Sequence, residues 1–353
     1  MKNLNDTASN PTGGGALGTP AAAQPDWQRK YGGWIVVVVI LAALCILPFY
    51  MKFYHIELSI IYFMSVILAV SYRLVTTTGD WGFAHIILQG VGAYATALLA
   101  KHAGIPFIVM VPLAGFVAAA VGGIIMIPML RTKGFAFFIA SFAFGEFIRM
   151  VWMKVNNPFG GTGGIVNIPS PELFGLKLSS SVNYYFACMA FMVASVFIMW
   201  RLDRSRIGNA WKSIHTDDML AECMGINVAR YRTMAFMVGS FFAGIAGALL
   251  AYRMGSIDPH NFEINQMVYL VIWVVIGGAT TFWGPLIGVT ILTVAFEWSR
   301  PLLEWRPLMF GSLLIMFLIF LPGGIESLVP ALRRPPGEHY ARFRRWLTKN
   351  RPG

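Results

Sequence analysis

The stretch SRIGNAWKSIHTDDMLAECMGINVARYR, residues 205–232, separates two long apolar runs, MAFMVASVFIMW before it and AFMVGSFFAGIAGALLAY after it. This stretch is polar and charged, whereas the whole chain is 57% hydrophobic and only 12% charged. A water-soluble protein of 353 residues would need more polar surface than this composition supplies. The sequence therefore predicts an all-α polytopic membrane protein with a polar segment between two of its spans.

A helix that crosses the hydrocarbon core of a membrane needs about 20 mostly apolar residues. By this criterion we expect about ten transmembrane helices, with eight or nine as alternatives because Gly and Pro interrupt several segments. An uncleaved first span is favoured over a signal peptide, since no small-residue cleavage site follows it. The candidate segments lie near 34–50, 56–75, 83–100, 105–130, 134–153, 184–201, 232–252, 265–282, 284–300 and 307–321.

The distribution of basic residues predicts the orientation of the chain. With ten spans and the amino terminus inside, 19 of the 27 Lys and Arg residues fall on the inner side. The positive-inside rule then places both termini, and the segment 205–232, in the cytoplasm. Residues 1–33 are expected to form a disordered cytoplasmic tail, residues 34–325 the transmembrane domain, and residues 326–353 a basic cytoplasmic tail. The net charge of +11 reflects these inner segments, and no nucleic-acid partner is expected.

The chain carries no recognisable catalytic motif. Its three cysteines, Cys45, Cys188 and Cys223, stand singly, which gives neither a disulfide framework nor a thiol metal site. GGTGG at 160–164 lacks the Lys and Ser/Thr of a phosphate-binding P-loop, so we expect a flexible outer loop there. Zinc-protease and serine-hydrolase motifs are also absent from the sequence. If the protein drives active uptake, another polypeptide must hydrolyse the nucleotide.

Residues 205–225 are predicted to form one amphipathic helix of about five turns. Ser205 is a suitable N-cap and Gly225 a suitable stop. One reading is an interfacial helix that lies on membrane lipid. The other is a docking helix that uses Trp211 and Ile214 as anchors in a groove of a soluble partner. Apolar residues recur at near-helical spacing on two neighbouring strips: Ile207, Trp211, Ile214 and Ala221, and then Met219, Cys223 and Met224.

This run resembles the cytoplasmic loop of permease subunits in branched-chain amino acid ABC importers. The matching positions are Ser205, Gly208, Ala210, Ile214, Asp218, Ala221, Glu222, Gly225, Ile226, Asn227, Val228 and Tyr231. The resemblance covers about residues 55–330 and is specific only as a combined pattern. It continues through GDWGFAHIILQGVGAYATALL (79–99), FAFFIASFAFGEFIR (135–149), DPHNF (258–262), VVIGGATTFWGPLIG (274–288) and RPLMFGSLLIMFLIFLPGGI (306–325).

The resemblance implies a subunit of the bacterial inner membrane that transports branched-chain or other hydrophobic amino acids. It implies four kinds of partner: cytoplasmic ABC ATPase subunits, a second homologous permease, a periplasmic or extracellular substrate-binding protein, and membrane lipid. ATP and Mg would be held by the ATPase subunits, with no cofactor bound by this chain. It also implies that the polar segment is a coupling helix, whose expected contact residues are Ser205, Gly208, Trp211, Ile214, Asp218, Ala221, Glu222 and Gly225.

Three alternatives to this function stay open at the level of sequence. Members of the same importer class also carry urea or short amides. An ion-coupled secondary carrier would need acidic residues near the membrane midplane and no ATPase. A membrane anchor or assembly factor would transport nothing.

Small residues recur every four positions in two predicted spans. This spacing lets helix backbones approach closely in a membrane, where lipid offers no hydrophobic drive for association. Close packing is the favoured interpretation, and a sliding interface during transport is the alternative. The residues are Gly239, Ala243, Gly247 and Ala251 in one span, and Gly284 and Gly288 in another.

A few polar residues are candidates for the transport pathway. The dipeptide WG occurs at 81–82 and at 283–284, each time before an apolar run, and paired helix breaks can mark a pathway. A satisfied interior histidine is the favoured reading of His85. Glu146 and Arg149 lie three residues apart and can pair, so a structural ion pair is favoured over a role in the path. The full set of pathway candidates is Asp80, His85, Gln89, Glu146 and Arg149.

Overall fold

The computed structural model describes residues 42–50, 52–173, 176–177 and 180–299, together with 305, 308, 311–312, 315–316 and 324. Both predicted tails, and most of the first and last predicted spans, lie outside the described residues. Two units are present, which divide after Tyr50. The described part of the first unit ends in the short 3-10 helix η1, Leu47–Phe49.

The second unit is built from helices joined by short connections. Its strands are two residues long and form two antiparallel pairs, β1 with β4 and β2 with β3. The helices are α2 Phe53–Thr76, α3 His85–Ala103, α4 Phe107–Met129, α5 Phe135–Lys154, α6 Ser181–Asp203, α7 Arg206–Thr216, α8 Asp218–Cys223, α9 Val228–Met254, α10 Ile264–Gly277 and α11 Gly284–Trp298. The shorter elements are η2 Gly161–Gly163, β1 Ile165–Val166, β2 Glu172–Leu173, β3 Leu176–Lys177, β4 Ser256–Ile257 and η3 Pro259–Phe262.

Five of the described helices are long and apolar enough to cross a membrane: α2, α4, α5, α6 and α9. Helix α11 is apolar but shorter, with 15 residues. The predicted segments between residues 56 and 300 coincide with α2–α6 and α9–α11. The expected all-α polytopic class is therefore supported. The total of ten spans is a prediction that the described residues do not settle.

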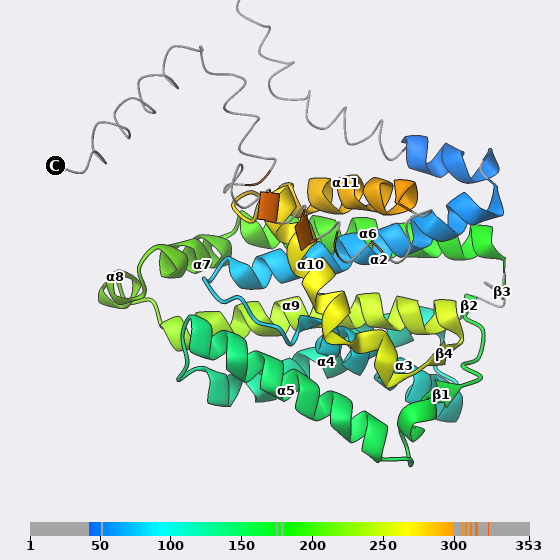
Figure 1. Cartoon of the computed structure of the whole chain (residues 1–353), viewed down its shortest axis with the longest axis horizontal. Helices are drawn as coiled ribbons and strands as arrows, with labels where there is room; N and C mark the ends of the chain where they lie inside the picture. The colour runs from blue at the N-terminus through cyan, green and yellow to red at the C-terminus, as the bar shows by residue number, and fades with distance from the viewer. Residues whose placement is uncertain are drawn as a thin grey trace, which may run out of the picture. The chain divides into compact units, whose positions relative to one another are not determined.

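The longest helix, α9, occupies the centre of the unit. Asn227 begins it by accepting a hydrogen bond from the Arg230 backbone N–H at 3.0 Å, and Gly255 ends it with a φ of +68°. Helix α9 lies against α2, α3 and α4, and most of its residues are buried. Figure 1 shows α7 and α8 at one end of the bundle and the four strands toward the other. These are called the α7–α8 end and the strand end below.

Glycines let the backbones of α9 and α3 come into contact. A Cβ atom added to Gly247 would lie 1.9 Å from the backbone oxygen of Gln89. A Cβ on Gly92 would lie 2.4 Å from the Cα of Gly244. On the α2 side, a Cβ on Gly239 would lie 2.4 Å from a methyl group of Val75. Such distances leave no room for a side chain at these positions, so α9 contacts the backbone of α3 and the Val75 side chain of α2.

The second series of small residues joins α10 to α11. A Cβ on Gly288 would lie 2.0 Å from the backbone oxygen of Trp273, and one on Gly277 would lie 2.0 Å from that of Gly284. Trp283 and Gly284 stand where α11 begins, and Trp81 stands in the connection before α3. The first WG pair therefore lies in the connection between α2 and α3, and the second marks the start of α11.

The GGTGG segment contains the 3-10 helix η2, and the expected flexibility of this loop stays a prediction. Gly160, Gly161 and Gly164 adopt φ values of +80°, +61° and +66°, which favour glycine. A Cβ on Gly164 would lie 2.0 Å from the backbone oxygen of Ile257 in β4. The segment leads directly into β1, which pairs with β4.

Replacement of Gly247 by Ala should destabilise the protein. The new methyl group meets α3 backbone atoms, which cannot move aside as a side chain can, and we expect a loss of about 1–3 kcal/mol. Thermal unfolding of the purified protein in detergent measures the effect. Gly123→Ala in α4 is the matched control, because its methyl group meets the flexible side chain of Met237 at 3.2 Å. Equal midpoints for both variants would contradict the backbone contact.

Candidate functional site

The polar segment at the α7–α8 end consists of two helices and not the single helix that was expected for 205–225. Ser205 caps α7 by accepting a hydrogen bond from the Gly208 backbone N–H at 3.4 Å. Asp217 then leaves helical geometry, with φ −160° and ψ 112°, and begins α8. Its carboxylate accepts hydrogen bonds from the backbone N–H groups of Met219 (2.9 Å) and Leu220 (3.1 Å). An aspartate that bonds the backbone in this way favours a new helix start over continuation.

Trp211 and Ile214 are buried within the chain, so the expectation that they are surface anchors is not met. The Trp211 side chain is fully buried, and its indole N–H donates to the backbone oxygen of Tyr231 at 2.9 Å. Ile214 packs in a cluster with Ala221 and Val228. Both anchors therefore attach the segment to the start of α9. A period of 3.6 residues distinguishes an apolar face from a polar one, but it does not reveal which apolar face meets the protein's own core.

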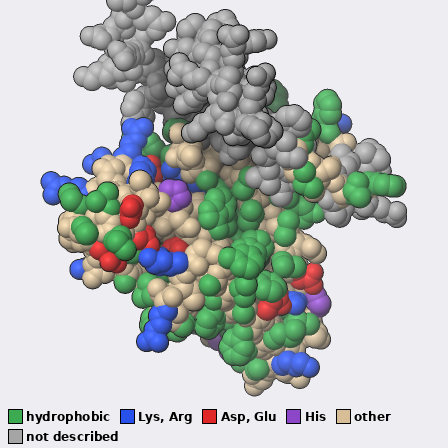
Figure 2. Space-filling view, turned by 60° about the vertical axis from the view of Figure 1, so that its left-hand side comes forward, with side chains coloured by type: hydrophobic (Ala, Val, Ile, Leu, Met, Phe, Trp, Pro, Cys, Tyr) green, Lys and Arg blue, Asp and Glu red, His purple; other side chains and the backbone are tan. Residues whose placement is uncertain are grey.

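The exposed apolar residues of the segment lie on α8. Met219, Leu220 and Met224 are 76%, 62% and 76% exposed. They are called the α8 apolar patch below. Met219 and Met224 belong to the second apolar strip that the sequence analysis described. That strip was therefore the sequence signal for the exposed face. In Figure 2, which turns this end forward, charged side chains gather around apolar ones there.

The remaining predicted residues of the segment have structural surroundings of three kinds. Gly208 lies so close to the end of α6 that a Cβ would be 2.3 Å from the Asp203 backbone oxygen. Asp218 forms an ion pair with Lys133 at 2.5 Å, which ties α8 to the connection between α4 and α5. Glu222 is exposed, and Gly225 follows α8 with a φ of +82°.

Arg73 joins the segment to three parts of the bundle. Its buried guanidinium forms an ion pair with Asp203 at 2.6 Å, at the end of α6. The same group donates to the backbone oxygens of Ala279 (3.2 Å) and Thr280 (3.1 Å), in the connection between α10 and α11. Asp203 also forms an ion pair with Lys212 of α7, at 3.0 Å. Helices α2, α6 and α7 and the α10–α11 connection therefore share one set of polar contacts, which is called the Arg73 network below.

Asp80 is the partner of a second buried arginine, Arg232 of α9. The Arg232 Nε donates to the Asp80 carboxylate at 2.7 Å, and its terminal nitrogen pairs with the other carboxylate oxygen. Thr78 donates to the same carboxylate at 3.1 Å, and Arg232 also reaches the Thr132 backbone oxygen at 3.3 Å. Through these charge-assisted hydrogen bonds the Asp80 side chain connects α9 to the segment before α3.

The other two candidates near the start of α3 also face the interior. The His85 ring nitrogen Nε2 lies 2.9 Å from the Ser71 hydroxyl, and the side chain is buried, as a satisfied interior histidine would be. Gln89 is buried where α3 meets Gly247 of α9. Asp80, His85 and Gln89 do not line the cleft described next.

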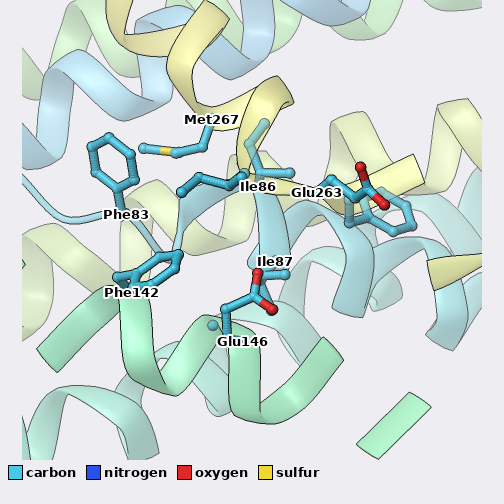
Figure 3. A pocket seen from close by; sticks show the side chains of 10 residues that line it. Phe83, Ile86, Ile87, Phe142, Glu146, Glu263 and Met267 are labelled. Atoms are coloured by element: carbon cyan, nitrogen blue, oxygen red, sulfur yellow. The ribbon is translucent and has the colours of Figure 1, made fainter. Parts of the chain in front are cut away.

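A cleft lies between α3, α5 and the start of α10, and Glu146 is on its wall (Figure 3). Arg149 pairs with Glu146 through two nitrogens, Nε at 2.9 Å and Nη2 at 2.8 Å from the same carboxylate oxygen. The predicted ion pair is therefore present, and its acid borders a cavity. No group of three potential metal-ligating side chains occurs among the residues that the structure describes.

The architecture defines an all-α, multi-pass membrane protein. The α7–α8 end carries charged side chains around the exposed α8 apolar patch. Residues 55–322 match the family of branched-chain amino acid transport system permease components, and the chain belongs to this family. It is 31% identical over 272 residues to the high-affinity branched-chain amino acid transport permease LivM of Salmonella typhimurium. That alignment covers 70% of this chain and 64% of the relative's length.

Two further relatives come from Escherichia coli K12. LivM is 27% identical over 321 residues, which is 83% of this chain and 74% of the relative. LivH, another high-affinity branched-chain amino acid transport permease, is 24% identical over 289 residues, covering 73% and 90% of the two chains. No solved structure gives a significant match. The family match extends from α2 to beyond α11 and includes the polar segment.

Removal of the Asp80 carboxylate should be strongly destabilising. Asp80→Ala leaves the buried Arg232 charge without its partner, at a cost of about 3–5 kcal/mol. Asp80→Leu combined with Arg232→Met should cost less, because it leaves no charge buried. Thermal unfolding in detergent compares these proteins. The control Asp218→Ala removes an ion pair whose Lys133 side chain is 62% exposed, with an expected effect below about 1 kcal/mol. If Asp218→Ala lowered the unfolding midpoint as much as Asp80→Ala, the buried ion pair between Asp80 and Arg232 would be refuted.

Proposed function

We propose that this chain is the membrane-spanning permease subunit of an ATP-driven, binding-protein-dependent importer for branched-chain amino acids. One observation carries the proposal: a chain of this family presents an exposed apolar patch, at Met219, Leu220 and Met224, on a charged end of its helix bundle. Exposed apolar groups within a polar surround are typical of protein interaction sites. The patch is the surface on which a cytoplasmic ABC ATPase subunit docks.

The α7–α8 end faces the cytoplasm of a bacterial inner-membrane protein, with both termini on the same side. Basic residues concentrated at this end support that orientation, among them Arg131, Lys133, Arg204, Arg206 and Arg230. The strand end then faces outward, where a substrate-binding protein delivers the amino acid. ATP and Mg are held by the ATPase subunits, and this chain contributes no nucleotide site or other enzymatic activity.

The contacts around α7 provide a route for movement from the ATPase to the spans. A displacement of α8 together with α7 acts on α9 through Trp211 of α7 and Tyr231 of α9, which share a hydrogen bond. It acts on α2 and on the α10–α11 connection through Lys212, Asp203 and Arg73. The segment 205–225 is therefore a coupling element made of two helices, in which the buried residues transmit force and the α8 apolar patch receives it.

A second, homologous permease completes the transport path. The similarity to both LivM and LivH supports this pairing, because a chain related to two permeases of one transport system is suited to a symmetric pair. The names of these relatives also favour branched-chain amino acids over urea or short amides as the substrate. An ion-coupled carrier would have no use for the α8 apolar patch, whereas a membrane anchor or assembly factor would show no substrate-dependent stimulation of a partner ATPase.

A charge in the α8 apolar patch should weaken ATPase docking. Leu220→Glu and Met224→Glu place a carboxylate where apolar surface is buried on association, and we expect affinity to fall at least about tenfold for each. Co-purification of the tagged permease with its ATPase subunits, followed by titration in detergent, measures this loss. Uptake into vesicles should fall in proportion.

Two control variants separate docking from folding. Met254→Glu places the same charge at an exposed methionine near the strand end and should leave ATPase binding unchanged. Trp211→Ala should lower the thermal unfolding midpoint, because it removes a buried side chain, whereas Leu220→Glu should not. ATPase binding that survives both α8 substitutions would exclude the docking role of this patch.

A further inference from the structure

The outward face of α6 changes from apolar to cationic where the helix reaches the α7–α8 end. Phe197 and Ile198 are 53% and 48% exposed, and Arg201 and Arg204, which follow them, are exposed as well. Positions 197, 201 and 204 are four and three residues apart, so their side chains share one face of the helix. Helix α6 is one of the helices that can cross a membrane. Its outward face therefore passes from apolar to charged within about two turns.

Trp200 stands between the apolar and the cationic part of this face. Its ring stacks on that of Phe197, with the centroids 6.0 Å apart and the ring planes at 28°. The Arg204 guanidinium lies over the Trp200 ring, 4.4 Å from its centroid, which is a cation–π contact. Tryptophan is enriched at the level where membrane hydrocarbon meets the lipid headgroups. The contact therefore keeps the Arg204 charge next to the ring, at the level where lipid phosphate groups lie.

The protein itself does not neutralise the positive charge of this face. Arg206, the first residue of α7, is also exposed. Arg201, Arg204 and Arg206 form no ion pair with an acidic side chain among the residues that the structure describes. Asp203, which lies among them in sequence, is buried in the Arg73 network. Three exposed guanidinium groups within six residues thus remain available to an external anion.

An anionic phospholipid has the complementary order of groups. We propose that the junction of α6 and α7 is a binding site for such a lipid. Its phosphate contacts Arg201, Arg204 and Arg206, and its acyl chains lie along Phe197 and Ile198. Guanidinium groups bind phosphate through paired N–H donors, and basic clusters beside a membrane span are typical of anionic-lipid sites. Free phosphate shares the headgroup chemistry but has no chains to cover the apolar part of the face.

The site at the α6–α7 junction differs from the α8 apolar patch in both charge and surroundings. Its arginines continue the exposed apolar face of a helix that can cross a membrane, and a water-soluble ATPase does not reach that face. Lipid is therefore favoured over an acidic surface of the ATPase. Of the two interpretations of the polar segment, contact with lipid then applies to its beginning, and contact with a soluble protein applies to α8.

Lipid titration of the purified full-length chain in a neutral detergent tests the site. Phosphatidylglycerol and phosphatidylcholine with identical acyl chains are compared, and native mass spectrometry gives the dissociation constant of each. We expect phosphatidylglycerol to bind at least about tenfold more tightly, because only its headgroup has a net negative charge. Millimolar inorganic phosphate should not displace it, since phosphate makes no contact with the apolar part of the face.

Removal of two arginines should abolish most of this preference. The double variant Arg201→Gln with Arg204→Gln should weaken phosphatidylglycerol binding at least about tenfold and leave phosphatidylcholine binding unchanged. The matched control, Arg131→Gln with Arg230→Gln, removes two exposed charges from the same end and should change either affinity by less than about twofold. Thermal unfolding without added lipid should be alike in all three proteins, because these are exposed side chains.

Four outcomes would overturn the proposal. An equal loss of phosphatidylglycerol affinity in both double variants would reduce the effect to overall charge. Displacement of the lipid by inorganic phosphate would indicate a small-anion site. Unchanged lipid binding together with weaker ATPase binding in the first double variant would assign its arginines to the ATPase interface. Loss of the lipid from the complex with the ATPases and the second permease would assign the face to another subunit. Lipid binding is measured without uptake, so the expected result does not depend on the proposed transport function.

Discussion

Backbone contact between α9 and the helices around it is the constraint on which the bundle depends. Gly247 and Gly244 bring α9 against α3, and Gly239 brings it against α2, at separations that no side chain would allow. Hydrophobic burial cannot hold helices together in lipid, because lipid chains are as apolar as the helix surfaces. Close approach of small residues, with the dispersion and polar contacts that it permits, replaces that drive. The end of α2, the segment before α3 and the start of α9 then meet at the α7–α8 end.

Two buried arginines complete this arrangement at the α7–α8 end. Arg73 gathers α2, α6, α7 and the α10–α11 connection, and Arg232 attaches α9 to the segment that carries Asp80. Each guanidinium has several fixed acceptors, so a shift of one partner changes the geometry of all of them. Trp211 adds a fixed contact between α7 and α9. The end that receives a soluble partner is therefore joined to the central helix by directional bonds and tight packing rather than by flexible linkers.

The cleft and the α8 apolar patch differ in how much rigidity surrounds them. The patch lies on a helix of six residues that begins at its own Asp217 cap and is held by Ala221 and by the Asp218–Lys133 pair. The cleft is bordered by three elements that belong to different parts of the chain, α3, α5 and the η3–α10 join.

Local sequence by itself determined the helices, because an apolar run of about 20 residues has few alternatives in a membrane. It also determined the Ser205 cap, the Glu146–Arg149 pair and the small-residue spacing, all of which depend on residues within one turn of each other. Tertiary structure alone decided which apolar strip of 205–225 is buried, and it reversed the expected role of Trp211. It also decided that Asp80 pairs with Arg232, across 152 positions of sequence. Periodicity records which residues share a face, but only packing against distant helices selects the face that remains outside.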